Sequence, residues 1–334
     1  MIPMEFYVIF IILVALVFDF LNGMNDAANS IATIVSTKVL SPRMAVAWAA
    51  FFNFAAAFGF GVAVAKTIGK GIIDPNIVTP DLILASLIGA IVWTHVCTHY
   101  GYPISVSHSL IGGLAGAGFF KSGISALNFT GINKVVLFIF LSPIIGLVIG
   151  FFLMIAVSWI FRKWNLRKVD KFFRIGQLVS SAAFGLGHGT NDAQKTMGII
   201  TILLYSTGYF QGQEMYVPVW VILAAHSAIG LGTLMGGWKV IGTMGVKLTH
   251  LKPVGGFCAE GSGAIVLLGT AIAGIPVSTT HTIAGAIMGV GATRRISAVR
   301  WGIVGKIVMA WILTIPTSAA IGALSYWIVT LIKH

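Results

Sequence analysis

The sequence predicts an all-α polytopic membrane protein with two inverted-topology repeats, broken or re-entrant helices and about 10–12 membrane segments. Three observations predict this fold class. Of the 334 residues, 57% are hydrophobic and 9% are charged, whereas soluble domains carry roughly 25% charged residues. The mean hydropathy is +0.95, as expected for a chain that crosses a membrane repeatedly. Two polar motifs each occur twice in the same order, which indicates an internal duplication.

Apolar stretches cover most of the chain, and the short ones flank the polar motifs. A helix needs about 20 residues to cross a ~30 Å hydrocarbon core, and several stretches are shorter, so we expect helix breaks shielded by protein or by a cavity. The first run lacks a basic flank and a cleavage site, so we expect it to be a retained membrane segment. The stretches are 5–22, 26–40, 44–65, 82–100, 104–120, 134–161, 175–187, 192–206, 217–236, 254–273, 277–293 and 300–332.

The first repeated motif is an Asn-Asp pair inside an apolar run. "FLNGMNDAANSI" contains Asn25 and Asp26, and "GLGHGTNDAQKTMG" contains Asn191 and Asp192. A carboxylate at membrane depth is costly and indicates a functional site. Because carboxylate and amide oxygens are hard ligands, the pairs can hold Na⁺, or the aspartates can carry protons.

A structural ion pair is the alternative explanation for the second carboxylate. Lys195 follows Asp192 by one helical turn and is the candidate partner. The matching position in the first half is Asn29, so only the second half can make this pair. Lys195 can alternatively contact a bound anion.

The second repeated motif is a proline followed by a cluster of hydroxyl residues. "YPISVSHSLIGGLAGAG" covers 102–118 and "IPVSTTHTIAGAIMGVG" covers 275–291. Ser105 and Ser278 are predicted N-caps of new helices. The unpaired N–H groups and the positive end of such a helix form an anion cradle, and two cradles from inverted halves can meet near the midplane. The alternative is that the hydroxyls only satisfy backbone groups at helix breaks.

The distribution of basic residues indicates that the two halves are inverted. We expect a first repeat over 1–161, a basic cytoplasmic linker over 162–174 with six Lys/Arg and one Asp, and a second repeat over 175–334. Lys38 and Arg43 follow the first Asn-Asp segment, whereas 206–216 has neither Lys nor Arg. Equivalent loops thus differ in basic charge, which favours opposite sides for them and an external position for both termini.

Other polar features are weaker candidates. Asp19 and Glu260 lie at apolar depth without repeat partners and suit either a cation or a local pairing. "HVCTH" (95–99) has metal-ligand spacing but no second copy, and the chain has no Walker motif. The glycines of 112–118 and 285–291 favour close helix packing.

The composition also bears on redox state and on partners. We expect Cys97 and Cys258 to be free, buried thiols, because both lie in apolar stretches. The net charge of +12 is attributed to cytoplasmic loops and lipid headgroups rather than to nucleic acid.

The sequence resembles the inorganic phosphate transporter (PiT) family of secondary carriers over essentially its whole length. The resemblance rests on "GMNDAANSIAT", "GTNDAQKTMG", "PISVSHS" and "PVSTTHT". It implies symport of phosphate with Na⁺ or H⁺, with the Asn-Asp pairs serving cations and the Ser/Thr motifs serving phosphate. The family often has a large hydrophilic insert between the halves, so this chain is a compact form. Val106 replaces a hydroxyl residue and leaves only a backbone N–H at its position.

Together these observations predict a non-enzymatic secondary active transporter that imports inorganic phosphate with Na⁺ or H⁺ across the cell (inner or plasma) membrane by alternating access. No cofactor and no metal other than Na⁺ are expected. Two alternatives stay open, a carrier of sulfate or another tetrahedral oxyanion and a passive anion channel; a metalloenzyme built on "HVCTH" is a third and remote one. The oligomeric state and a cytosolic regulator docking on 162–174 also stay open. The predicted phosphate ligands are Ser105, Val106, Ser107, Ser109, Ser278, Thr279, Thr280, Thr282 and Lys195; the predicted cation ligands are Asn25, Asp26, Asn191 and Asp192.

Overall fold

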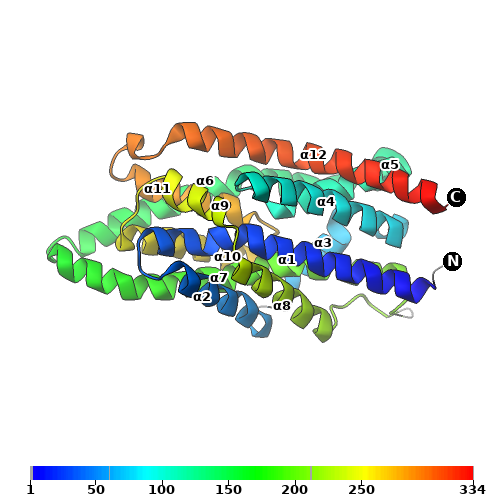
Figure 1. The fold of residues 1–334 in the computed structure, drawn as a ribbon, viewed down its shortest axis with the longest axis horizontal. Helices are drawn as coiled ribbons and strands as arrows, with labels where there is room; N and C mark the ends of the chain where they lie inside the picture. The colour runs from blue at the N-terminus through cyan, green and yellow to red at the C-terminus, as the bar shows by residue number, and fades with distance from the viewer. Residues whose placement is uncertain (1–2, 60, 211–212, 334) are drawn as a thin grey trace.

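The computed structural model describes residues 3–59, 61–210 and 213–333, and these residues are almost entirely helical (Figure 1). Short 3₁₀ or π turns join several helices, and one isolated β-bridge links Ile73 to Leu127. The α-helices are α1 (Met4–Ser36), α2 (Pro42–Ala55), α3 (Ala63–Gly71), α4 (Pro80–Tyr100), α5 (Val106–Ser122), α6 (Phe129–Ile160), α7 (Leu166–Ser206), α8 (Val219–Met235), α9 (Trp238–Gly242), α10 (Pro253–Ile272), α11 (Thr279–Ala292) and α12 (Trp301–Lys333).

Helices α1 and α7 run through the Asn-Asp pairs without a break, so the expected interruptions at these pairs are wrong. Each helix joins two of the predicted apolar segments into one long element. A polar side chain need not break a helix when other helices supply its partners, and that is the case for both pairs. Helix α7 starts at Leu166, with Asn165 as N-cap, so most of the basic stretch 162–174 is helical.

The helix breaks lie instead at the Ser/Thr motifs. Helices α4 and α5 form one hairpin, and α10 and α11 form another. The first arm of each ends near a glycine with positive φ, Gly101 at 75° and Gly274 at 66°, a backbone region in which glycine carries no Cβ penalty. Both hairpin tips therefore present the start of a new helix.

The two halves of the sequence interlock in space. Helix α5 of the first half packs against α12 of the second, and α11 of the second packs against α6 of the first. Glycines make these contacts close: a Cβ at Gly116 would overlap the backbone at Ala319, and a Cβ at Gly289 would overlap the backbone at Leu147. This confirms close packing as the role of the glycine-rich runs.

Five described helices are long and apolar enough to cross a membrane. They are α1, α4, α6, α10 and α12. Two bent pairs of helical segments, Pro42–Phe58 with Ala63–Gly69 and Val219–Met235 with Trp238–Gly245, would bring the number to seven. The short second arms of the hairpins and α7 are not among these spans. The protein is a multi-pass membrane protein.

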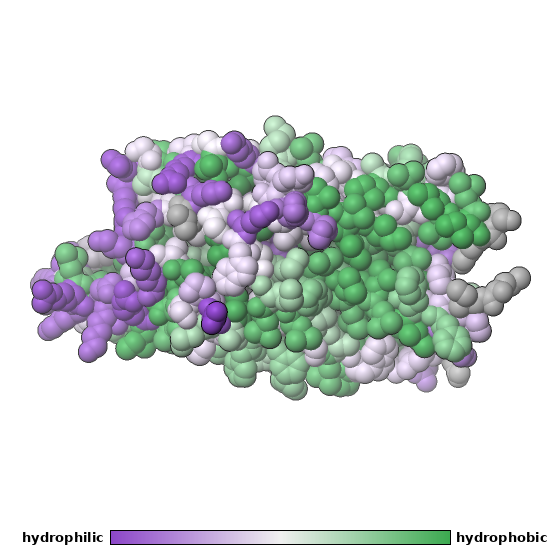
Figure 2. Space-filling view, viewed as in Figure 1, coloured by the Kyte–Doolittle hydropathy of each residue, from purple (hydrophilic) through white to green (hydrophobic). Residues whose placement is uncertain are grey.

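The two ends of the molecule differ in polarity. Both termini lie at one end, and the corner between α6 and α7 lies at the other (Figure 1). Hydrophilic residues gather at the end with the α6–α7 corner, whereas hydrophobic residues cover much of the rest of the face shown in Figure 2. The basic stretch and the termini thus lie at opposite ends, as the charge pattern predicts.

The hydrophobic core is divided into two clusters with a polar layer between them. Along α1, residues from Val8 to Phe18 belong to one cluster and residues from Ala28 to Ile34 to the other. Helix α7 repeats this division, with Phe184 in one cluster and Ala193 in the other. The Asn-Asp pairs of both helices lie between these positions.

Candidate functional site

The hairpin tips are built as the proline and serine residues predict. Ser105 Oγ accepts a hydrogen bond from the His108 backbone N–H at 3.3 Å, and Ser278 Oγ accepts one from His281 N–H at 3.2 Å. Each serine is the N-cap of its helix, α5 or α11. The remaining N–H groups of each first turn stay available for an anion.

The two tips touch each other at the centre of the protein. Thr280 Oγ1 donates to the carbonyl oxygen of Ile104 at 3.0 Å. The rings of His108 and His281, which occupy equivalent positions in the repeats, lie with centroids 4.8 Å apart. Two helix starts from different halves therefore face one common region.

Two buried carboxylates converge on the first residue of α11. Thr279 Oγ1 lies 3.2 Å from Asp26 Oδ2 and 2.9 Å from Asp192 Oδ2. Thr280 Oγ1 lies 3.3 Å from Asp26 Oδ1. The single Thr279 hydroxyl proton can serve only one carboxylate at a time. The other carboxylate must therefore be satisfied by a different group.

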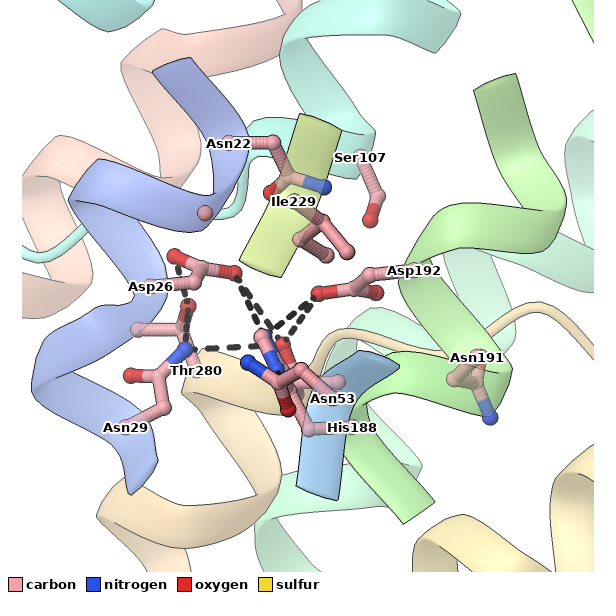
Figure 3. A network of polar contacts seen from close by, with 12 residues as sticks. Asn22, Asp26, Asn29, Asn53, Ser107, His188, Asn191, Asp192, Ile229 and Thr280 are labelled. Atoms are coloured by element: carbon pink, nitrogen blue, oxygen red, sulfur yellow. Dashed lines mark hydrogen bonds and ion pairs between the residues drawn. The ribbon is translucent and has the colours of Figure 1, made fainter. Parts of the chain in front are cut away.

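His188 completes this cluster (Figure 3). Its Nε2 lies 3.1 Å from Asp192 Oδ2 and 3.9 Å from Asp26 Oδ2, and its Nδ1 lies 3.1 Å from Asn53 Oδ1. Among the described residues, Asp26, His188 and Asp192 form a group with the spacing of metal ligands. The sequence prediction missed His188, although it precedes Asp192 by four residues and so shares its helix face.

Lys195 connects the carboxylates to both hairpins. Its ammonium forms an ion pair with Asp192, donates to Ser107 Oγ, and donates to the Val277 carbonyl oxygen at 2.9 Å. The side chain is only 2% exposed. The local ion pair considered from sequence is thus present, and the same ammonium also lies against both Ser/Thr motifs.

The repeats are chemically unequal around the two aspartates. Asn22 and Asn29 on α1 occupy the positions that His188 and Lys195 occupy on α7. Asn29 Nδ2 donates to Thr280 Oγ1 at 2.9 Å. Asp192 therefore has an ammonium and an imidazole as neighbours from its own helix, whereas the neighbours of Asp26 on its own helix are neutral amides.

Asn25 and Asn191 point away from the carboxylates and fasten the hairpins. Asn25 Nδ2 donates to Thr98 Oγ1 on α4 at 2.6 Å. Asn191 Nδ2 donates to the Leu267 carbonyl oxygen at 3.3 Å and to Thr270 Oγ1 at 3.4 Å, both on α10. Figure 3 shows the Asn191 side chain turned away from the cluster.

The predicted phosphate ligands also divide into two groups. Ser107, Thr279 and Thr280 face the polar cluster through the contacts above. Ser109 and Thr282 instead hydrogen-bond the carbonyls of their own N-caps, Ser105 and Ser278.

The valine of the first motif has a specific consequence for the site. Val106 is fully buried in the apolar core. Its repeat equivalent is Thr279, so only the second half supplies a hydroxyl between the carboxylates.

Glu260 forms a separate polar cluster in the interior. Its carboxylate accepts hydrogen bonds from Thr33 at 2.5 Å, Gln177 at 2.9 Å and Ser180 at 2.6 Å. All four side chains are buried. The carboxylate is thus fully hydrogen-bonded by neutral groups.

The "HVCTH" stretch and the cysteines have simpler environments. His95 and His99 are exposed and Cys97 is buried, so α4 does not bring them together as ligands. Cys97 and Cys258 are free and buried, as expected.

Comparisons with known proteins all match this chain to proteins described as phosphate transporters. The pattern of the Phosphate transporter family matches residues 22–322. A probable low-affinity inorganic phosphate transporter of Rhizobium meliloti (strain 1021) is 57% identical over 322 residues, covering 96% of each chain. A similarly described protein of Bacillus subtilis (strain 168) is 45% identical and covers 97% of each. A solved structure described as the sodium-dependent phosphate transporter superposes with a TM-score of 0.90 at 29% identity, over 98% of this chain and 99% of that one.

Proposed function

Because the chain belongs to the phosphate transporter family, we propose that it imports inorganic phosphate by symport with Na⁺. The relatives are transporters rather than enzymes, and this chain is likewise a transporter. The observation that carries the proposal is the meeting of Asp26 and Asp192 at Thr279, beside the ammonium of Lys195 and between two helix starts.

Charge balance explains why phosphate should travel with cations. Asp26, Asp192 and Lys195 together carry one net negative charge when His188 is neutral. Adding a phosphate anion to a buried region of that charge is strongly unfavourable, because an uncompensated ion in a low-dielectric site costs several kcal/mol or more. Cations bound at the two carboxylates remove this cost, so anion and cation binding become mutually dependent.

The phosphate is assigned to the region where the two hairpin tips meet. Backbone N–H groups of α5 and α11, the hydroxyls of Ser107 and Thr280 and the Lys195 ammonium supply donors suited to a tetrahedral oxyanion. Phosphate must compete with Asp192 and Val277 for Lys195. Binding thereby loosens the contact between Lys195 and the tip of the second hairpin, and opening of the tips to one side or the other gives alternating access.

Coupling to H⁺ is a second candidate, favoured by the position of His188 between the two carboxylates. Histidine in general is a suitable proton carrier, because its unperturbed pKa lies close to neutral pH. The cell or inner membrane is the proposed location, with the end that carries 162–174 in the cytoplasm.

The test is uptake of labelled phosphate into proteoliposomes under a Na⁺ gradient or a pH gradient alone, with excess sulfate as competitor. Concentrative uptake that needs Na⁺ and resists sulfate supports the proposal. Uptake driven only by the pH gradient would show that H⁺, not Na⁺, is the coupling ion. If phosphate only moves down its own concentration gradient and neither the Na⁺ gradient nor the pH gradient drives uptake, the protein is a channel. Strong inhibition by sulfate would indicate that sulfate is also a substrate. The Asp26→Asn and Asp192→Asn variants should lose the ion dependence.

A further inference from the structure

Helix α1 carries a polar stripe that extends well beyond the aspartate at the centre. Asp19, Asn22, Asp26, Asn29 and Thr33 are spaced alternately by three and four residues and lie on one face of the helix. All five are buried. With a rise of 1.5 Å per residue, the stripe spans about 21 Å. Figure 3 shows three of its members, Asn22, Asp26 and Asn29, following one another along α1.

The two ends of the stripe differ in how their carboxylates are satisfied. At the inner end of the stripe, toward the C-terminus of α1, Thr33 donates to Glu260. Glu260 also accepts hydrogen bonds from Gln177 and Ser180. At the outer end of the stripe, toward the N-terminus of α1, Asp19 Oδ1 accepts one hydrogen bond, from Asn22 Nδ2 at 3.4 Å. Asp19 therefore has far less compensation than Glu260, although both are fully buried.

Three oxygens at the outer end lack a hydrogen-bond partner among the described residues. They are Asp19 Oδ2, Asn22 Oδ1 and Thr196 Oγ1. Thr196 comes from α7 and lies near the Asp19 carboxylate without forming a hydrogen bond of normal geometry with it. Buried oxygens of this kind are normally hydrogen-bonded, and each unpaired one is costly.

The charge at this position is also unbalanced. Asp19 makes no ion pair with a Lys, Arg or His in the described part of the chain. The charged groups that act on the Asp19 carboxylate are Asp192, which repels it, and His188, which attracts it when protonated. Its repeat equivalent is Gly185, so the second half adds no matching carboxylate. An isolated buried carboxylate needs a bound cation or a proton.

We propose that Asp19, Asn22 and Thr196 form a second Na⁺ site, outward of the Asp26–Asp192 cluster. The inference rests on the proposed Na⁺ symport. One anionic and two neutral oxygens are hard ligands of the type that Na⁺ takes. A cation takes several oxygen ligands at once, which suits a place where three buried oxygens lack partners. The site lies one to two helical turns from Asp26, on the side of the termini, and therefore receives Na⁺ before the central cluster does.

The experiment measures Na⁺ binding separately from transport. Purified protein is titrated with NaCl at constant ionic strength (choline chloride as replacement) without phosphate, and its thermal unfolding is followed, because an ion that binds the folded state raises the midpoint temperature. Variants Asp19→Asn, Asp19→Glu and Thr196→Val are compared with Thr201→Val, whose hydroxyl on the same helix only bonds the Met197 carbonyl. Na⁺-dependent uptake and its Hill coefficient are then measured in proteoliposomes.

The proposal expects the Na⁺ concentration for half-maximal stabilisation to rise about tenfold in Asp19→Asn and severalfold in Thr196→Val, with the Hill coefficient for uptake reduced. Asp19→Glu should retain part of the response, and Thr201→Val should behave as wild type. Wild-type Na⁺ responses in both Asp19→Asn and Thr196→Val would overturn it, as would a stability that follows pH through Asp19 but ignores Na⁺. If Asp19→Asn does not fold, the Na⁺ responses of Thr196→Val and Asp19→Glu test the proposal. If Na⁺ stabilises the protein through Asp19 but phosphate uptake does not require Na⁺, the proposed Na⁺ symport is wrong and the proposed Na⁺ site stands.

Discussion

The Lys195 ammonium donates a hydrogen bond to the backbone carbonyl of Val277, at a distance of 2.9 Å. Val277 lies in the tip of the second hairpin, two residues before α11 begins. The charge that pairs with Asp192 is thus tied directly to the segment that must move if the tip opens. Ion binding and hairpin position are therefore linked through one side chain.

Replacing Lys195 should affect both folding and phosphate binding. In Lys195→Met, Asp192 loses its ammonium partner, and removing one member of a buried ion pair costs about 3–5 kcal/mol. The phosphate KM should rise at least about tenfold, since a charged donor to the anion is lost. Thermal unfolding and uptake kinetics check both effects. The double variant Lys195→Met/Asp192→Asn should recover stability but not phosphate affinity; recovery of both would remove Lys195 from the phosphate site.

The Thr279 hydroxyl should matter for cation binding more than for stability. Thr279→Val keeps the shape but removes the group between Asp26 and Asp192, so the half-saturating Na⁺ concentration for uptake should rise about 5–30-fold, equivalent to about 1–2 kcal/mol. Thr201→Val is the matched control, because its buried hydroxyl bonds only its own helix. Equal Na⁺ dependence in the two variants would show that the hydroxyl is not a ligand.

The close packing of α11 against α6 at Gly289 should make substitutions there destabilising. Gly289→Ala should destabilise the protein by about 1–3 kcal/mol, because the new Cβ would overlap the backbone at Leu147 of α6. Gly269→Ala on α10 is the control, since a Cβ there meets nothing within 4 Å, and alanine in a helix gains about 0.5–1 kcal/mol over glycine. Thermal unfolding in detergent compares the two. A similar loss in both would indicate a general intolerance of substitution.

The orientation in the membrane is testable by cysteine labelling. Lys168 on α7 and Ser125, in the turn between α5 and α6, are both exposed. Lys168→Cys should react with an impermeant thiol reagent only from the cytoplasmic side, and Ser125→Cys only from the outside. The native Cys97 and Cys258 are buried and should give low background. Labelling of both positions from the same side would contradict the proposed topology.

The parts of the site that follow local rules were predictable from sequence. Proline before serine fixed the hairpin tips and their N-caps at Ser105 and Ser278, because capping depends on residues only a few positions apart. The continuity of α1 through Asn25 was not predictable in this way, because its partner Thr98 lies 73 residues away. The spacing of His188 to Asp192 on the same helix was a usable signal, but its contacts with Asn53 and Asp26 come from other helices and were not predictable. Only the fold reveals which buried polar groups satisfy one another.

The exchange of helices between the halves has a consequence for biosynthesis. The glycine face of α5 is made early, but α12, its packing partner, is made much later, after α6 to α11. The small-residue face of α5 therefore stays without its α12 partner until α12 has been made. We expect chains truncated before α12 to be degraded by membrane proteases, even though α1 to α11 are present. Stable insertion of the first hairpin therefore depends on α12.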